Sequence, residues 1–340
     1  MTEDVVANTA WLVLATAYGA DSLLGDNAYP LHPVRLIGRT IALLERGLRA
    51  LGLSGLAGGA LLAAATVAAV LGVYTQLRWL CGVWHPAAAF ALDAFVVYSC
   101  LALKDMARHA LPVAAALEAG DLPAARAAVQ GIVGRDAAVL DAAGVARAAV
   151  ESVAESFVDG FYAPVCWFTA GAVLAGVVGA QTVPWAVGAA LVYRVVNTLD
   201  SMVGYRDARY LFFGRVSART DDALNFVPAR LSLPLLAAAA AVCRLDFRAG
   251  WRVALRDRLK HESPNSAHAE SFAAGALGLR LGGPTQYADG PVDKPWIGDG
   301  SAAARPVHIR DVCRLVRWGG ALSVAACVVL LIAAGGAWGR

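Results

Sequence analysis

The segment "ESVAESFVDGFYAPVCWFTAGAVLAGVVGA", from Glu151 to Ala180, places Glu151, Glu155 and Asp159 four residues apart, directly before a run without charge. Residues at i, i+4 and i+8 lie on nearly one face of an α-helix, and like charges at this spacing repel. The uncharged run is long enough to enter a bilayer. The segment therefore predicts a membrane-embedded helix with an acidic face at its start.

The composition extends this expectation to the whole chain. Of its 340 residues, 58% are hydrophobic and 16% are charged, and the mean hydropathy is +0.56. Soluble domains carry about 25% charged residues, so we expect an all-α, polytopic integral membrane protein. The acidic N-terminus "MTEDVVANTA" is not typical of a signal peptide. The six cysteines form no C-x-x-C pair and are expected to be buried apolar residues.

Apolar runs of roughly 17–25 residues predict the spans. These runs lie at about 5–24, 56–77, 80–103, 160–180, 184–203 and 318–338. A shorter run, 227–243, contains Pro228 and Pro234 and is interpreted as re-entrant or buried. We treat 1–340 as a single membrane-embedded domain.

Arginine-rich loops alternate with nearly uncharged ones, and the positive-inside rule makes the arginine-rich loops cytoplasmic. Loop 104–157 reads as helical, with Asp121 as an N-cap and Pro123 in the first turn of a helix. Loop 244–317 is also expected inside, an orientation that requires 227–243 not to cross. Its part 282–306 is rich in Gly and Pro and is expected to be irregular.

Three groups of carboxylates and arginines are candidates for chemistry. The opening triad would bind Mg²⁺, because a divalent cation turns repulsion into coordination; a solvated helix face is the alternative. Arg194, Asn197 and Asp200 lie near one face inside an apolar span, where ionisable residues mark functional sites, unless Arg194 and Asp200 form a structural pair. Further along, Arg219 and Arg230 flank the possible ligands Asp221, Asp222 and Asn225.

A fourth group lies in "RDRLKHESPNSAHAESFAAGALGLRLGG", residues 256–283. It consists of His261, Glu262, Ser263, Asn265, His268 and Glu270. The two histidines are seven apart without a third soft ligand, which argues against zinc and favours phosphate binding or acid–base work. The chain contains neither a P-loop nor a G-x-G-x-x-G motif, and no nucleic-acid partner is expected.

The motifs "HPVRLIGR", "KDMARHA", "IVGRDAAVLD", "ESVAESFVDGFYAPVCW", "NTLDSMVGYRDARYLFFGRVSARTDDALNFVPARL" and "HESPNSAHAESFAAGALGLRLGG" together resemble the cobinamide-phosphate synthase family, the CobD/CbiB type. The resemblance runs from about Asp21 to Gly298, with Ser156 as a departure where the family usually has Asn. It implies cobalamin biosynthesis by an acid–amine ligase. Such an enzyme would join the corrinoid adenosylcobyric acid to (R)-1-amino-2-propanol or its O-phosphate, with ATP as co-substrate and Mg²⁺.

With this resemblance, each candidate residue receives an expected role. The metal ligands would be Glu151, Glu155, Asp159, Asp221 and Asp222. The anion and substrate binders would be His32, Arg35, Arg194, Arg219, Arg230, Ser263 and Asn265. Proton transfer and substrate positioning would fall to His261, Glu262, His268, Asn197 and Asp200.

Two other interpretations remain open at this point. One is a Mg²⁺-dependent membrane transferase of prenyl or lipid substrates, and the other is an ion-coupled transporter, although no inverted repeat is visible. The ligase would be a multi-pass protein of the cytoplasmic membrane, with its active site on the cytoplasmic face. Its further partners would be the lipid bilayer and other membrane enzymes of the pathway; the sequence does not define an oligomeric state.

Overall fold

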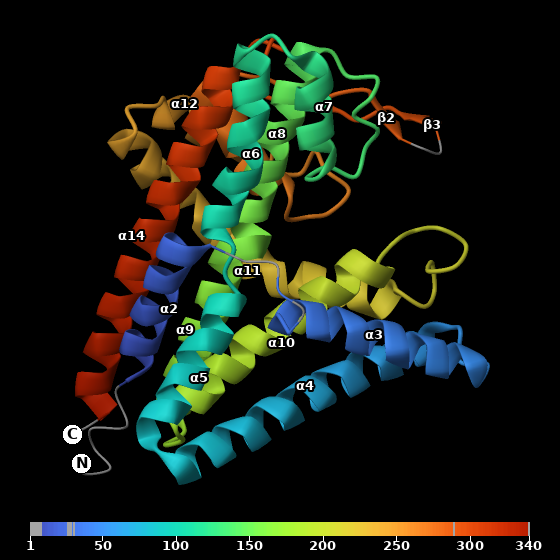
Figure 1. Cartoon of the computed structure of the whole chain (residues 1–340). Helices are drawn as coiled ribbons and strands as arrows, with labels where there is room; N and C mark the ends of the chain where they lie inside the picture. Colours follow the sequence, from blue (N-terminus) through green and yellow to red (C-terminus); the bar gives the residue numbers. More distant parts are fainter. Residues whose placement is uncertain (1–8, 26–28, 30, 288–289, 339–340) are drawn as a thin grey trace. The chain divides into compact units, whose positions relative to one another are not determined.

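A computed structural model describes residues 9–25, 29, 31–287 and 290–338 of the chain (Figure 1). The fold is almost entirely helical, as predicted. The contacts divide it into two compact units: unit 1 comprises 1–102, 163–224 and 324–340, and unit 2 comprises 103–162 and 225–323. Two helices, α11 (Arg215–Val242) and α14 (Pro306–Trp338), and two helical runs, 86–118 and 142–177, pass from one unit into the other. The single domain of the sequence analysis thus contains two compact bodies.

Unit 1 is built on helices at both ends of the chain and in its middle. The helices wholly within it are α2 (Ala10–Leu24), α3 (Pro33–Ala50), α4 (Leu56–Trp84), α5 (Pro86–Ser99), α9 (Ala163–Val177) and α10 (Thr182–Val203). Part of its core joins α3, α4 and α10 through Ile41, Leu62 and Leu199, all fully buried. Gly171 lets α9 approach α10, because a Cβ there would lie 2.6 Å from the Trp185 carbonyl oxygen.

The helices wholly within unit 2 are α6 (Leu103–Glu118), α7 (Leu122–Gln130), α8 (Ala142–Phe157), α12 (Phe247–Asp257) and α13 (Ala267–Leu277). Aspartate side chains cap the starts of α7, α8 and α12. Asp121 caps α7 by accepting a hydrogen bond from the Ala124 N–H at 2.9 Å, and Pro123 lies in the first turn, which confirms the predicted start. Asp141 caps α8 in the same way at 2.7 Å.

Four connections carry the chain between the units, the first of them through residues 100–102 between α5 and α6. α8 continues through the π-helical turn η1 (Val158–Tyr162) into α9, while α11 (Arg215–Val242) and α14 (Pro306–Trp338) each cross as one helix. The segment 227–243 is therefore the second half of a continuous helix up to Val242, with both prolines inside it. The orientation argued from this segment stays a prediction.

Five helical segments within the described residues are long and apolar enough to cross a membrane. They are Leu56–Trp84, Pro86–Glu118, Ala142–Val177, Arg215–Val242 and Pro306–Gly336. Helix α2 is apolar but shorter, and residues 5–8 of its expected span lie outside the described residues. Helix α10, expected as a span at 184–203, is not among the five; it carries Arg194 and Asp200.

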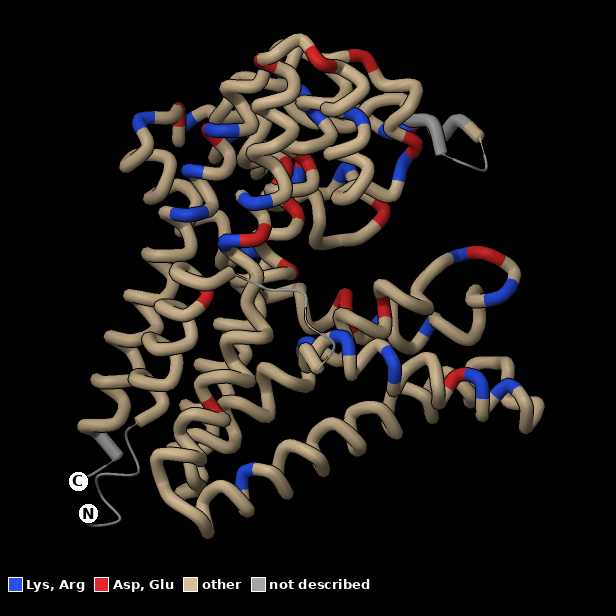
Figure 2. Tube along the Cα trace, viewed as in Figure 1, with Lys and Arg blue, Asp and Glu red and all other residues tan. Residues whose placement is uncertain are grey.

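Charge is unevenly distributed over unit 1. It gathers along α3, the loop after α10 and the start of α11, whereas α4 and α5 are almost without it (Figure 2). Arg78 of α4 and Asp93 of α5 pair at 3.1 Å, and Asp93 also accepts a hydrogen bond from the Tyr74 hydroxyl at 2.7 Å. Pairing of this kind neutralises charge inside an apolar segment.

The region 281–297, within a stretch expected to be irregular, contains four short strands. Strand β1 (Leu281–Gly282) pairs antiparallel with β4 (Trp296–Ile297), and β2 (Thr285–Tyr287) pairs with β3 (Gly290–Val292). Strands of two or three residues carry no alternating side-chain pattern, so the sequence offered no signal for them. Their importance lies in the contact that β1 makes with α8.

Candidate functional site

Glu151, on α8, is a buried carboxylate of unit 2 that contacts residues from two other segments. Its carboxylate is buried, accepts a hydrogen bond from the Arg135 guanidinium and accepts another from the Gly282 N–H at 2.7 Å. Arg147, one turn earlier on α8, approaches within 4.0 Å. Both oxygens of Glu151 thus already accept hydrogen bonds, which connect α8 to the loop before it and to β1.

Glu270 and Glu155 form a second acidic element beside Glu151. Helix α13 packs against α8, which buries Glu270 within electrostatic reach of both α8 carboxylates. Burial raises the pKa of Glu270 well above its usual value, and the charges of Glu155 and Glu151 raise it further. Close buried carboxylates do not all ionise, so this group retains a proton that an exposed Glu would release.

His261 belongs to the same group through its electrostatic environment. Burial lowers the pKa of His261, while the charge of Glu155 acts in the opposite direction. The His261 Nδ1 accepts a hydrogen bond from the Ser263 N–H at 3.1 Å, and Glu262 is exposed. We refer to Glu151, Glu155, His261 and Glu270 as the acidic cluster.

His268 lies on α13 outside this cluster. It is fully buried, and its Nδ1 lies 3.1 Å from the Asn265 carbonyl oxygen, a geometry that assigns the proton to Nδ1. Burial lowers the pKa of His268 to about 4, with Arg230 and Arg258 adding to the effect. Within the described part of the chain, Nε2 has no hydrogen-bond partner. The imidazole is therefore neutral near pH 7 and offers a lone pair at Nε2.

Three further predicted residues are linked to one another by hydrogen bonds: Arg230, Ser263 and Asn265. Arg230 donates to the Asn265 side-chain oxygen at 3.3 Å and to the Phe226 carbonyl at 2.6 Å, and its guanidinium lies over the Phe226 ring. The Ser263 hydroxyl accepts from the Asn265 N–H at 3.3 Å. These contacts place Arg230, Ser263 and Asn265 in one connected network of unit 2.

A separate polar group lies in unit 1. Arg194 donates to the Asn197 side-chain oxygen at 3.2 Å and to the Cys100 carbonyl, while Asn197 donates to Asp221 at 3.4 Å. Asp200 lies within electrostatic reach of Asp221 and Asp222. The structure therefore brings together the two groups that the sequence suggested separately, on α10 and on the first turns of α11.

The remaining predicted anion binders of unit 1 differ in exposure. His32 is buried and caps α3, accepting a hydrogen bond from the Val34 N–H at 3.3 Å. Arg35 and Arg219 are exposed on α3 and α11. The cap gives His32 a structural role that the sequence analysis did not assign.

The expected metal ligands divide between the units, with Asp221 and Asp222 in unit 1 and the other three in unit 2. Asp159 lies in η1, where i→i+5 bonding replaces the α-helical pattern, so the predicted single acidic face ends at Glu155. Among the residues that the structure describes, no three His, Cys, Asp or Glu side chains are arranged to hold a metal ion. Mg²⁺ binding by these residues stays a prediction.

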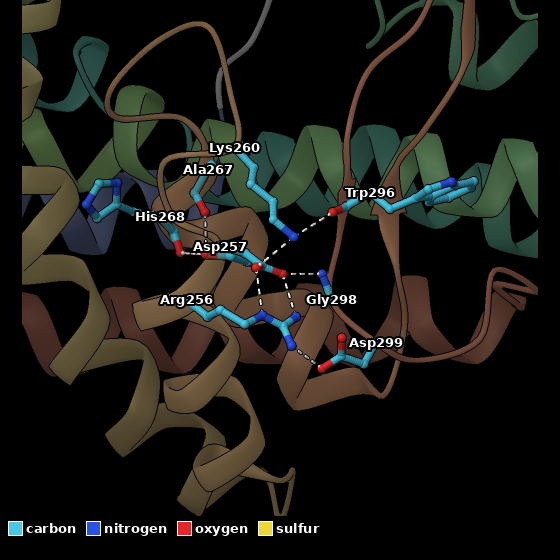
Figure 3. Close-up of polar contacts among 9 residues, drawn as sticks. Arg256, Asp257, Lys260, Ala267, His268, Trp296, Gly298 and Asp299 are labelled. Carbon is cyan, nitrogen blue, oxygen red and sulfur yellow. Dashed lines mark hydrogen bonds and ion pairs between the residues drawn. The ribbon is translucent and has the colours of Figure 1, made fainter.

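Asp257 was not singled out by the sequence, yet it is one of the most strongly paired carboxylates in unit 2 (Figure 3). Fully buried, it accepts two hydrogen bonds from Arg256, one from the Gly298 N–H at 2.8 Å, and pairs with Lys260 at 2.9 Å. The Arg256 hydrogen bonds hold the pKa of Asp257 far below its usual value, against the effect of burial. This arrangement fastens the end of α12 to the loop after β4.

Sequence reasoning placed Glu270 in a cluster but gave it no role, and it missed Arg135 and Gly282. A carboxylate inside the apolar stretch "AHAESFAAGAL" is the signal that identifies Glu270 as buried and as a candidate functional residue. No comparable local signal exists for Arg135 or for a glycine N–H, because their contacts depend on how α8 packs.

Comparison with known proteins agrees with the expected family. The family model described as CobD/Cbib protein matches residues 14–316. The cobalamin biosynthesis protein CobD of Geobacter metallireducens is 42% identical over 325 residues, which cover 96% of each chain. CobD of Klebsiella pneumoniae is 41% identical over 311 residues, 91% of each chain. CbiB of Salmonella typhimurium is 39% identical over 332 residues, 95% of this chain and 96% of the relative. No solved structure matches the chain.

Proposed function

Because the chain belongs to the CobD/CbiB family, we propose that it is a multi-pass membrane enzyme of cobalamin biosynthesis that forms an amide. Its substrates would be the carboxylate of a corrinoid, adenosylcobyric acid, and the amine of 1-amino-2-propanol or its O-phosphate. The product would be adenosylcobinamide or its phosphate. The named role of the relatives supports the pathway, and their coverage of nearly the whole chain supports a shared activity.

The chemistry requires activation of a carboxylate and a neutral amine. A corrinoid carboxylate oxygen would attack the terminal phosphorus of ATP, releasing ADP and giving an acyl phosphate. The amine nitrogen would then attack the acyl carbon, expelling phosphate and losing a proton. General bases positioned near the nitrogen accelerate this kind of step by about 10²–10⁴-fold.

The acidic cluster carries the proposal for proton transfer. Glu270 is buried beside Glu155 and Glu151, and burial together with their charges raises its pKa, so that Glu270 holds a proton next to these carboxylates. His261 lies in the same electrostatic environment and has its pKa lowered by burial, which favours the neutral, proton-accepting imidazole. We assign Glu155 and His261 to accepting the ammonium proton, and the protonated Glu270 to exchanging a proton within the cluster.

The Arg194 group is proposed to bind anionic parts of the substrates. Arg194 is buried and hydrogen-bonded to Asn197, which fixes its guanidinium before any ligand arrives. Guanidinium groups suit carboxylate and phosphate oxygens. We also propose that the active site faces the cytoplasm, on the basis of the arginine-rich loops, and that the reaction uses Mg²⁺ and ATP, on the basis of the family resemblance.

The proposal is tested with purified full-length protein in detergent or nanodiscs, supplied with adenosylcobyric acid, aminopropanol or its phosphate, ATP and Mg²⁺. We expect a product whose mass equals that of the two substrates less one water, and none when ATP or the amine is omitted. Parallel reactions with EDTA in place of Mg²⁺ test separately whether amide formation depends on the metal ion. Folded protein that gives no amide with either amine would contradict the ligase assignment.

A further inference from the structure

Helix α12 has two apolar faces, and only one of them is covered. Gly250, Val253 and Ala254 are buried where α12 packs against α13. A Cβ on Gly250 would lie 2.9 Å from the Phe272 ring, so this contact is close and fixes the rotation of α12. Phe247, Trp251 and Leu255, at i, i+4 and i+8, therefore stay exposed as one stripe, with exposed fractions of 41%, 38% and 54%.

The stripe forms one wall of a groove of about 810 Å³. Ala237, which lies in the last two turns of the membrane-length helix α11, also lines the groove. Arg248, Arg252 and Arg256 also line the groove. An apolar slot with arginines along it fits an amphiphile that carries negative charge at one end.

The arginines of the groove are not equivalent. Arg256 is paired with Asp257 at 2.7 Å and with Asp299 at 2.6 Å (Figure 3). For Arg248 and Arg252, by contrast, no ion pair with any described carboxylate is present; the guanidinium of Arg248 lies 5.7 Å from the Phe247 ring centroid. Two uncompensated cations therefore lie next to the exposed stripe, within the basic stretch along α12 in Figure 2.

The position of α12 in the chain indicates what covers it. Helix α11 carries no charge from residue 231 to its end at Val242, and only residues 243–246 separate it from Phe247. The connection contains Arg244 with φ of 58°, in the left-handed region that favours glycine. Basic side chains and a Trp directly after a membrane helix lie at the depth of the lipid phosphates.

We propose that this groove binds an anionic phospholipid, with the phosphate on Arg248 and Arg252 and an acyl chain along Trp251, Leu255 and Ala237. The inference is independent of the proposed reaction, because none of these residues belongs to the acidic cluster or the Arg194 group. It gives unit 2 a lipid contact of its own, beyond the burial of membrane-length helices. Bound lipid would hold the α11–α12 junction at the membrane surface.

Native mass spectrometry of the full chain, titrated with phosphatidylglycerol or phosphatidylcholine, tests the proposal. The wild type should retain phosphatidylglycerol preferentially, and the double variant R248Q/R252Q should lose about tenfold in affinity for it while phosphatidylcholine binding stays unchanged. The matched control R280Q/R305Q removes two exposed arginines of the same unit and should bind as wild type. Trp251→Gln should weaken retention of both lipids.

Several outcomes would overturn the assignment. If R248Q/R252Q binds phosphatidylglycerol with wild-type affinity, Arg248 and Arg252 do not bind its phosphate. If both double variants lose the same affinity, the lipid is attracted by the general positive charge and not by this groove. Displacement of the lipid by excess inorganic phosphate would mean that the site takes free phosphate. If R248Q/R252Q fails to fold, the proposal is tested on the wild-type protein. Phosphatidylglycerol should then raise its melting temperature, less so at high salt, and phosphatidylcholine should not raise it.

Discussion

Glu151 and Gly282 lie 131 positions apart, yet the Gly282 N–H donates a 2.7 Å hydrogen bond to the Glu151 carboxylate. The same carboxylate accepts from Arg135, so one buried side chain holds a loop and a strand against α8. The residue that the sequence analysis assigned to metal thus has a structural function in unit 2. Proton transfer is proposed for its neighbours Glu155 and Glu270.

Glu151→Gln should destabilise the protein. Removing the charge leaves the partly buried Arg135 and Arg147 without their buried counter-ion, and loss of one partner of a buried charged hydrogen bond costs about 1–3 kcal/mol. We expect a lower melting temperature in detergent. Glu118→Gln is the matched control, since Glu118 pairs with Arg310 at the exposed surface and its loss should leave the melting temperature nearly unchanged. Equal melting temperatures for wild type and Glu151→Gln would contradict this role.

Glu270→Gln should separate stability from catalysis. Since burial and the neighbouring carboxylates favour the protonated acid, an amide of the same shape should be tolerated with little loss of stability. Amide formation should fall at least tenfold, because the side chain no longer exchanges a proton. Turnover equal to wild type would remove Glu270 from the reaction.

Glu155→Gln should shift the pH dependence of kcat/KM. The charge of Glu155 raises the pKa of Glu270, so its removal lowers that pKa and allows Glu270 to ionise at lower pH. In the plot of kcat/KM against pH, we expect the inflection caused by ionisation of Glu270 to shift to lower pH. A profile that loses height without moving would instead indicate that the two carboxylates do not interact.

His268 should make stability depend on pH. Its folded-state pKa of about 4 lies below its unfolded value, so the unfolded chain binds more protons between these values and stability falls as the pH drops from about 6.5 to about 4. His268→Gln should flatten this part of the melting-temperature curve relative to wild type. His109→Gln, at an exposed position, is the control and should leave the slope unchanged. An unchanged slope in His268→Gln would contradict the burial argument.

Asp200→Asn tests the polar group of unit 1. It removes repulsion between Asp200 and the pair Asp221 and Asp222, so the melting temperature should not fall. If the group binds substrate, amide formation should fall or the KM for the corrinoid should rise despite the intact fold. Asp293→Asn, an exposed position in unit 2, is the control. Unchanged kinetics would limit Asp200 to a structural role.

What the sequence predicted well depends on short-range rules. Apolar runs identified the helical membrane class, and the Asp121–Pro123 pair located the start of α7, because capping involves residues three apart. The π-helical turn at Val158 was not predicted, since no residue pattern marks it, and it displaced Asp159 from the expected acidic face. The candidate residues were identified, but their partners depend on long-range packing of α13 on α8 and of α10 with α11.

The central claim is that the chain activates a corrinoid carboxylate with ATP and converts it to an amide. Adenosylcobyric acid labelled with ¹⁸O in the reacting carboxylate tests it most directly. We predict that amide formation transfers one ¹⁸O to inorganic phosphate, in equal amount to the product. Label in AMP would contradict the acyl phosphate, and the absence of both labelled phosphate and amide with folded protein would contradict the claim itself.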